Sequence, residues 1–172
     1  MKHFLWLSIV LILLTLLYIT LLSGKNKNKT LSQHIATNKI YKIIFFVICL
    51  LVVSSSSLTL FLYIPSKIPV NIIYYILIGI ITISLITLSA FPDTKGISAK
   101  IHNIAAWTMA YSMLPVITYI YFLDNNLLSF VSIFAMILLQ VKLKLSKANI
   151  LYIQISYILI FLANILYFTY AV

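Results

Sequence analysis

The stretch FLWLSIVLILLTLLYITLLS, residues 4–23, decides the class of fold to which this chain belongs. It carries no charged side chain, and it matches the roughly 20 apolar residues that one helix needs to cross a bilayer. It is longer than the roughly 7–15 apolar residues of a secretory signal, and LLSG at residues 21–24 does not resemble a small-residue cleavage site. We therefore predict a retained membrane-spanning helix over residues 4–23.

The composition extends this expectation to the whole chain. Of the 172 residues, 63% are hydrophobic and 8% are charged, and the mean hydropathy is +1.14. Soluble domains contain about 45–50% apolar and about 25% charged residues. The length leaves no room for a soluble catalytic domain beside the expected spans.

Further apolar stretches follow the first, separated by short polar connections. We predict an all-α fold, a polytopic transmembrane bundle of six helices that forms a single domain over residues 1–172. The predicted spans are residues 4–23, 43–64, 70–90, 103–123, 127–141 and 148–171. Residues 24–42 are predicted to form a basic cytoplasmic loop with a short surface helix near residues 31–36.

The lysines predict how the bundle is oriented. All basic residues except Lys2 and Lys67 fall in the first, third or fifth loop, which lie on one side of a six-span bundle. Short loops rich in lysine or arginine stay in the cytoplasm. We therefore expect a multi-pass protein of the cell membrane, with its basic loops cytoplasmic and both termini outside.

The formal net charge of +10 does not indicate nucleic-acid binding. Every basic residue is a lysine next to an apolar segment, where contact with anionic lipid headgroups explains it. Arginine, which reads phosphate and guanine through paired donors, is absent. We expect membrane lipids as partners, with a membrane-protein partner or a homo-oligomer as alternatives, no nucleic acid and no cofactor.

The connection FPDTKGISAKIH, residues 91–102, is the candidate for specific recognition or chemistry. It holds Asp93 and His102, which are weak catalytic candidates as an acid/base or metal-binding pair. A zinc site needs at least three ligands, and only His34 is expected on the same side. Asp93 and His102 therefore remain candidates, and we assign neither a catalytic nor a metal site. We expect Pro92, Asp93, His102 and Trp107 to bind lipid or a partner, or to serve as turn and interfacial residues.

Two polar patterns lie within the expected spans. Gln154, Tyr157 and Asn164 are expected on one face of the last helix, directed into the bundle, where amides join helices or contact a substrate. The serines at residues 54–57 indicate close helix packing, or else a permeation path. Cys49, the only cysteine, is expected to act as a small buried hydrophobe.

One part of the sequence consists of an apolar span that ends in FPD at residues 91–93, a Gly-containing connection, and His102 followed by Ala105 and Ala106. This part resembles the DUF998 family of small six-span membrane proteins. That family is similar to the wider Frag1/DRAM/Sfk1 set. The resemblance implies a compact six-helix bundle without established enzymatic activity and, by analogy, a role in lipid organisation. It also implies an N-terminus inside the cell, opposite to the lysine pattern, and we keep the lysine pattern.

Three functions follow as hypotheses. The first is a non-enzymatic bundle that binds lipid or a membrane partner. The second is a small transporter or channel-like component, although ionisable residues within the expected spans, which pumps normally use, are missing. The third is a metal-dependent lipid hydrolase that uses Asp93 and His102.

Overall fold

The computed structural model describes residues 2–23, 28–36, 38–91, 96–146 and 149–171, and within them the chain is helical without strands. The helices are α1 (Lys2–Ser23), α2 (Leu31–Ile35), α3 (Lys39–Ser57), α4 (Ile64–Lys67), α5 (Ile72–Ala90), α6 (Gly96–Asp124), α7 (Leu127–Leu145) and α8 (Ile150–Ala171). A π-helical segment, η1 (Leu58–Tyr63), joins α3 to α4. The predicted all-α class is confirmed.

Six helical stretches among the described residues are long and apolar enough to cross a membrane. Five are single helices, and the remaining one is the continuous rod of α3, η1 and α4. In each stretch only 17% to 33% of the most apolar window is buried inside the bundle. Most of this apolar surface therefore faces outward, where hydrocarbon is its favourable environment.

Two helices begin earlier than their apolar cores predict. The third helix in the chain, α3, begins at Lys39 rather than at residue 43, and α6 begins at Gly96 rather than at residue 103. Hydropathy marks only the part of a helix that matches the hydrocarbon, whereas backbone hydrogen bonds continue beyond it. His102 consequently lies within α6 instead of at its start.

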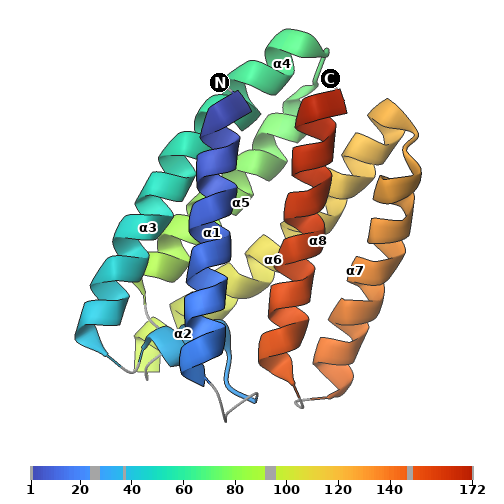
Figure 1. Cartoon of the computed structure of the whole chain (residues 1–172). Coiled ribbons are helices and arrows are strands. Elements are labelled where there is room, and N and C mark those ends of the chain that lie inside the picture. Colours follow the sequence, from blue (N-terminus) through green and yellow to red (C-terminus); the bar gives the residue numbers. More distant parts are fainter. Residues whose placement is uncertain (1, 24–27, 37, 92–95, 147–148, 172) are drawn as a thin grey trace.

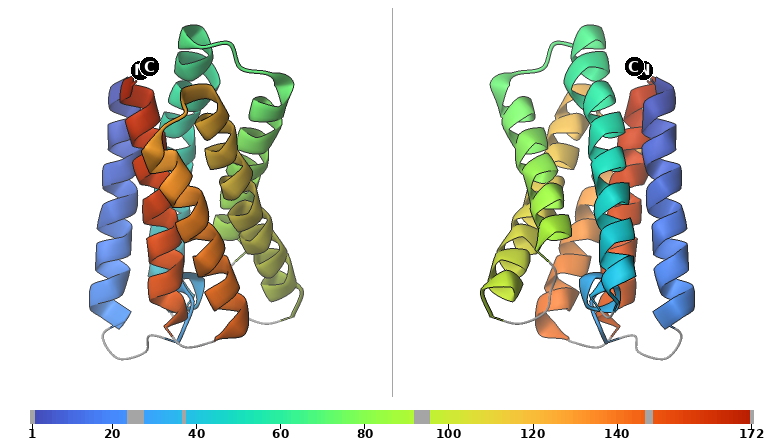
Figure 2. Two further views of the ribbon diagram at one scale, coloured as in Figure 1. Left: turned by 90° about the vertical axis from the view of Figure 1, so that its right-hand side faces the viewer. Right: turned by 90° about the vertical axis from the view of Figure 1, so that its left-hand side faces the viewer.

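The six long stretches form a ring in the order α1, α3, α5, α6, α7 and α8, which closes where α8 meets α1 (Figures 1 and 2). Both termini lie at one end of this bundle, called here the termini end. The short helix α2 lies at the opposite end, called the α2 end. The lysines of α3, α6 and α7 are close to the α2 end, and Lys67 is at the termini end.

The termini end is densely packed. Ile64, Tyr74, Ile117 and Phe168 come from α4, α5, α6 and α8, and each is at most 1% exposed. The Tyr74 hydroxyl donates a hydrogen bond to Leu60 O at 2.9 Å, so the aromatic ring is buried without leaving its polar atom unpaired. The hydrophobic core of the bundle is therefore concentrated at this end.

The π-helical segment explains how a proline fits into the second span. Pro65 has no N–H, and its ring would clash with the carbonyl four residues before it in a regular α-helix. Directly before this proline, Ile64 N donates to Thr59 O, five residues back, which widens the turn. The helix thus continues through Pro65 to Lys67 instead of ending at residue 64, the predicted boundary.

A candidate binding cavity inside the bundle

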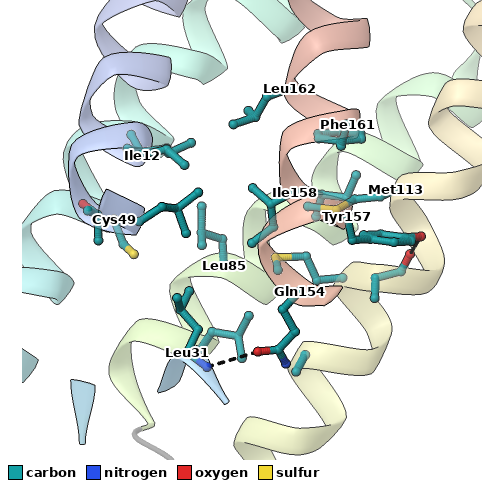
Figure 3. A pocket seen from close by; sticks show the side chains of 18 of the residues that line it. Ile12, Leu31, Cys49, Leu85, Met113, Gln154, Tyr157, Ile158, Phe161 and Leu162 are labelled. Atoms are coloured by element: carbon teal, nitrogen blue, oxygen red, sulfur yellow. Dashed lines mark hydrogen bonds between the residues drawn. The ribbon is translucent and has the colours of Figure 1, made fainter. Parts of the chain in front are cut away.

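A cavity of about 660 Å³ lies inside the ring of helices and extends from core residues such as Leu5 and Ile165 to Leu31 of α2 (Figure 3). Its wall is mostly aliphatic and includes Ile12, Leu85, Ile158 and Leu162. Pockets that bury small ligands have volumes of roughly 300–1,000 Å³ and mainly apolar walls with a few polar groups. This cavity has both properties.

The packing between α1 and α8 differs at the two ends of the bundle, and this difference leaves space for the cavity. At the termini end the two helices meet directly, with the rings of Trp6 and Tyr170 6.3 Å apart. At the other end Ile35 of α2 forms a buried cluster with Ile19 of α1 and Leu151 of α8. The short helix therefore supplies the wall of the bundle at the α2 end.

Local sequence explains why α2 forms there. Thr30 caps the helix, because its Oγ1 accepts from Gln33 N at 3.2 Å while Gln33 Oε1 accepts from Thr30 N at 3.1 Å. The N–H of Leu31 has no partner within such a short helix, and it donates to Gln154 Oε1 of α8 at 3.1 Å (Figure 3). The helix expected near residues 31–36 is present, but Ile35 is only 7% exposed. It is inserted into the bundle instead of lying on its surface.

Polar side chains gather where the cavity approaches α2. His102 lines the cavity and is 4% exposed. Its Nδ1 lies 2.7 Å from Phe91 O. A carbonyl oxygen only accepts hydrogen bonds, so Nδ1 carries the hydrogen, and Nε2 makes no hydrogen bond with the described residues. This bond ties the end of α5 to α6.

Two amides extend this polar end. Asn103 and Gln154 both line the cavity, from α6 and α8. Gln154 uses its oxygen to hold Leu31 N, which leaves both amide hydrogens available. Trp107 also lines the cavity and stacks on Tyr111, with ring centroids 5.5 Å apart. The cavity thus has an aliphatic body and one polar end.

A hydrogen-bonded junction joins α6, α7 and α8 beside the cavity. The hydroxyl of Tyr157 donates to Ala110 O at 2.6 Å, and Gln140 Nε2 donates to the Tyr157 oxygen at 2.6 Å and to Ala110 O at 3.3 Å. Pro115 has no N–H, so it leaves the carbonyl of Tyr111, the residue after Ala110, without its helical donor. Gln140 was not among the predicted site residues, although an amide inside the expected span 127–141 indicates a contact between helices.

We expect Tyr157→Phe to lower the free energy of unfolding by about 1 kcal/mol, because it removes the hydroxyl that joins α8 to α6. Reversible unfolding of the purified protein in mixed micelles measures the change. Tyr167→Phe, at a side chain that is 46% exposed on the same helix, should have little effect. Equal effects of the two substitutions would contradict the role of the junction.

The three polar residues predicted on one face of α8 point in two directions, toward the cavity and toward α7. Gln154 and Tyr157 face the cavity, whereas Asn164 is 1% exposed and donates to Ser132 Oγ of α7 at 2.7 Å. Because each residue turns an α-helix by about 100°, a spacing of ten leaves Asn164 about 80° away from Gln154. Asn164 therefore joins α8 to α7.

The serine run of α3 mainly serves helix packing. Ser55 is buried, and its hydroxyl pairs with that of Ser8 in α1 at 2.5 Å. Ser54 is exposed and donates to Leu50 O of its own helix at 2.8 Å. Ser56 reaches the cavity but donates to Val52 O at 2.6 Å. Cys49 is 4% exposed and lines the same wall.

Of the candidate acid/base pair, Asp93 and His102, the structure describes only His102. Pro92 and Asp93 lie outside the described residues, so only His102 can be placed. His34 belongs to α2 and does not line the cavity. Among the described residues, no group of three or more His, Cys, Asp or Glu side chains could hold a metal ion.

The six long apolar helices and their outward-facing apolar surface define the class: this is a multi-pass membrane protein. No family model, curated protein or solved structure matches the chain.

Proposed function

We propose that this protein is a non-enzymatic bundle of the cell membrane that holds a lipid in its interior cavity. The cavity of about 660 Å³ is the observation that carries this function. Its aliphatic wall suits an acyl or prenyl chain, and its polar end suits the part of the lipid next to the headgroup. The resemblance to the DUF998 family points in the same direction, but by analogy alone.

The orientation belongs to this proposal. We place the α2 end at the cytoplasmic face and both termini outside, because the described lysines at residues 39, 42, 100, 142 and 144 lie on helices near that end. The polar end of the cavity then lies at headgroup depth, and the chain of the lipid points toward the middle of the bilayer.

A transporter is the less favoured alternative. Buried side chains around Ile117 and Phe168 fill the interior near the termini end and leave less room there for a solute path than at the α2 end. A metal-dependent hydrolase is also less favoured, because a metal site needs at least three ligands and the described residues bring no three His, Cys, Asp or Glu side chains together.

The lipid content of the detergent-purified protein tests the function. Native mass spectrometry should find the wild-type protein with one retained lipid of a defined class. We expect Ile158→Trp to reduce the retained lipid severalfold, because the larger indole would project into the cavity and take part of the space that a lipid chain needs. Ile158 projects from α8 into the cavity (Figure 3).

The neighbouring residue supplies the matched control. Leu159 is 39% exposed and does not line the cavity, so Leu159→Trp should retain the lipid of the wild-type protein. Thermal unfolding of both variants shows whether each is folded. Retention of the lipid by folded Ile158→Trp protein, or equal loss from both variants, would count against a lipid in the cavity.

A further inference from the structure

Two side chains at the polar end of the cavity keep hydrogen-bonding groups that the described residues do not use. His102 commits Nδ1–H to Phe91 O, and its Nε2 is an acceptor that makes no hydrogen bond with the described residues, although it is not among their fully buried atoms. Gln154 commits its oxygen to Leu31 N, and its amide hydrogens remain. A buried polar atom without a partner costs free energy. These groups therefore favour a ligand that both donates and accepts.

The described lining of this cavity carries no lysine, aspartate or glutamate side chain. The nearby Lys144 does not line it; its Nζ lies 5.6 Å from the centre of the Tyr111 ring. A carboxylate or phosphate in the cavity would lose its water without gaining a cation, which is strongly unfavourable. A charged headgroup is therefore disfavoured at this position.

We infer that the cavity selects an uncharged lipid with a free hydroxyl group, such as a diacylglycerol or a long-chain isoprenoid alcohol. The hydroxyl donates to His102 Nε2, and its oxygen accepts from the amide of Gln154 or Asn103. The hydrocarbon chain packs along the aliphatic wall that includes Ile158. This inference rests on the proposed function and specifies the class of lipid.

The competing classes fit less well. A hydrocarbon or a wax-like ester has no hydrogen to donate and leaves Nε2 without a partner. A fatty acid carries a charge when ionised, and the described lining offers it hydroxyls, amides and a histidine but no lysine. Both hydroxylated classes share the same recognition chemistry, so the two sources must be separated by measurement.

A titration of delipidated wild-type protein, followed by native mass spectrometry, tests the selectivity. The probes are dioleoylglycerol, its O-methyl ether, dioleoyl phosphatidate and a polyprenol. We expect dioleoylglycerol to bind about tenfold more tightly than its methyl ether, as the loss of one hydrogen bond to a buried acceptor predicts. Phosphatidate should bind more weakly than dioleoylglycerol. The tighter of dioleoylglycerol and polyprenol identifies the source of the natural ligand.

His102→Asn isolates the acceptor. An asparagine amide at this position keeps a donor for Phe91 O, and its own acceptor, Oδ1, does not reach as far as Nε2 does, so the preference for the alcohol over its methyl ether should fall to near one. Asn103→Leu is the companion variant, since this exposed side chain makes no hydrogen bond with the described residues. It should weaken both ligands equally and keep the tenfold preference.

The outcomes distinguish selectivity for a hydroxyl group from lipid binding as such. Equal affinity for the alcohol and its ether, or a preference for phosphatidate, overturns the inference. The proposed function survives that result if Ile158→Trp still reduces the bound lipid. If no probe binds the wild-type protein, the proposed function fails as well.

Discussion

Phe168→Ala is expected to lower the free energy of unfolding by about 3–5 kcal/mol, the usual cost of truncating a buried phenylalanine. Phe168 is 1% exposed and belongs to the packed core at the termini end, with Ile64, Tyr74 and Ile117. The core there contains close-packed side chains, so the atoms removed would leave a void that its neighbours fill only in part. Reversible unfolding in mixed micelles measures the loss.

Two other substitutions in the same helix serve as controls for this prediction. Tyr167 is 46% exposed, and Tyr167→Ala should change the free energy of unfolding by at most about 0.5 kcal/mol. Ile158→Ala should cost about 1 kcal/mol, because Ile158 borders the cavity and has packing partners on one side only. Similar losses for Phe168→Ala and Ile158→Ala would contradict the division of the interior into a packed core and a cavity.

The sequence was sufficient to predict the class of fold and the number of spans. Each span contains enough consecutive apolar residues, and in hydrocarbon a helix is the way to satisfy the backbone of a single segment. The ends of α3 and α6 were less predictable, since Lys39 and Gly96 continue helices beyond the apolar stretches. Hydropathy carries no signal for such extensions.

The cavity could not be predicted, because its wall and the outer surface have the same composition. Ile158 faces the cavity and Leu159 faces outward, yet both are large aliphatic residues next to each other. In a helix of a soluble protein the outward residue would be polar, so the alternation of polar and apolar residues in the sequence would indicate the inner face. Here the difference depends on how α1 and α8 pack around α2.

The polar residues were more informative than the apolar ones. Gln154 and Tyr157 were expected inside the bundle, and they line the cavity; His102 was singled out, and it lies at the polar end. Their partners were not predictable, because Leu31 N, Phe91 O and Ala110 O are backbone atoms. A backbone group carries no sequence signal.

Labelling from outside the cell should separate the two ends of the bundle almost completely. In a Cys49→Ser background, Ser66→Cys is expected to react with a membrane-impermeant maleimide in intact cells. Gln33→Cys is expected to react only after the membrane is opened. Ser66 lies in α4 at the termini end and Gln33 in α2 at the other, and both side chains are exposed.

The expected pattern follows from the lysines. Lysines in short loops are retained on the cytoplasmic side during insertion, and anionic lipids then hold them there. Denatured protein provides the control, because both cysteines should react fully once the fold is lost. The reverse pattern in intact cells would favour the orientation that the family resemblance implies. The polar end of the cavity would then face the outside, so a lipid would have to enter with its hydroxyl at the outer leaflet.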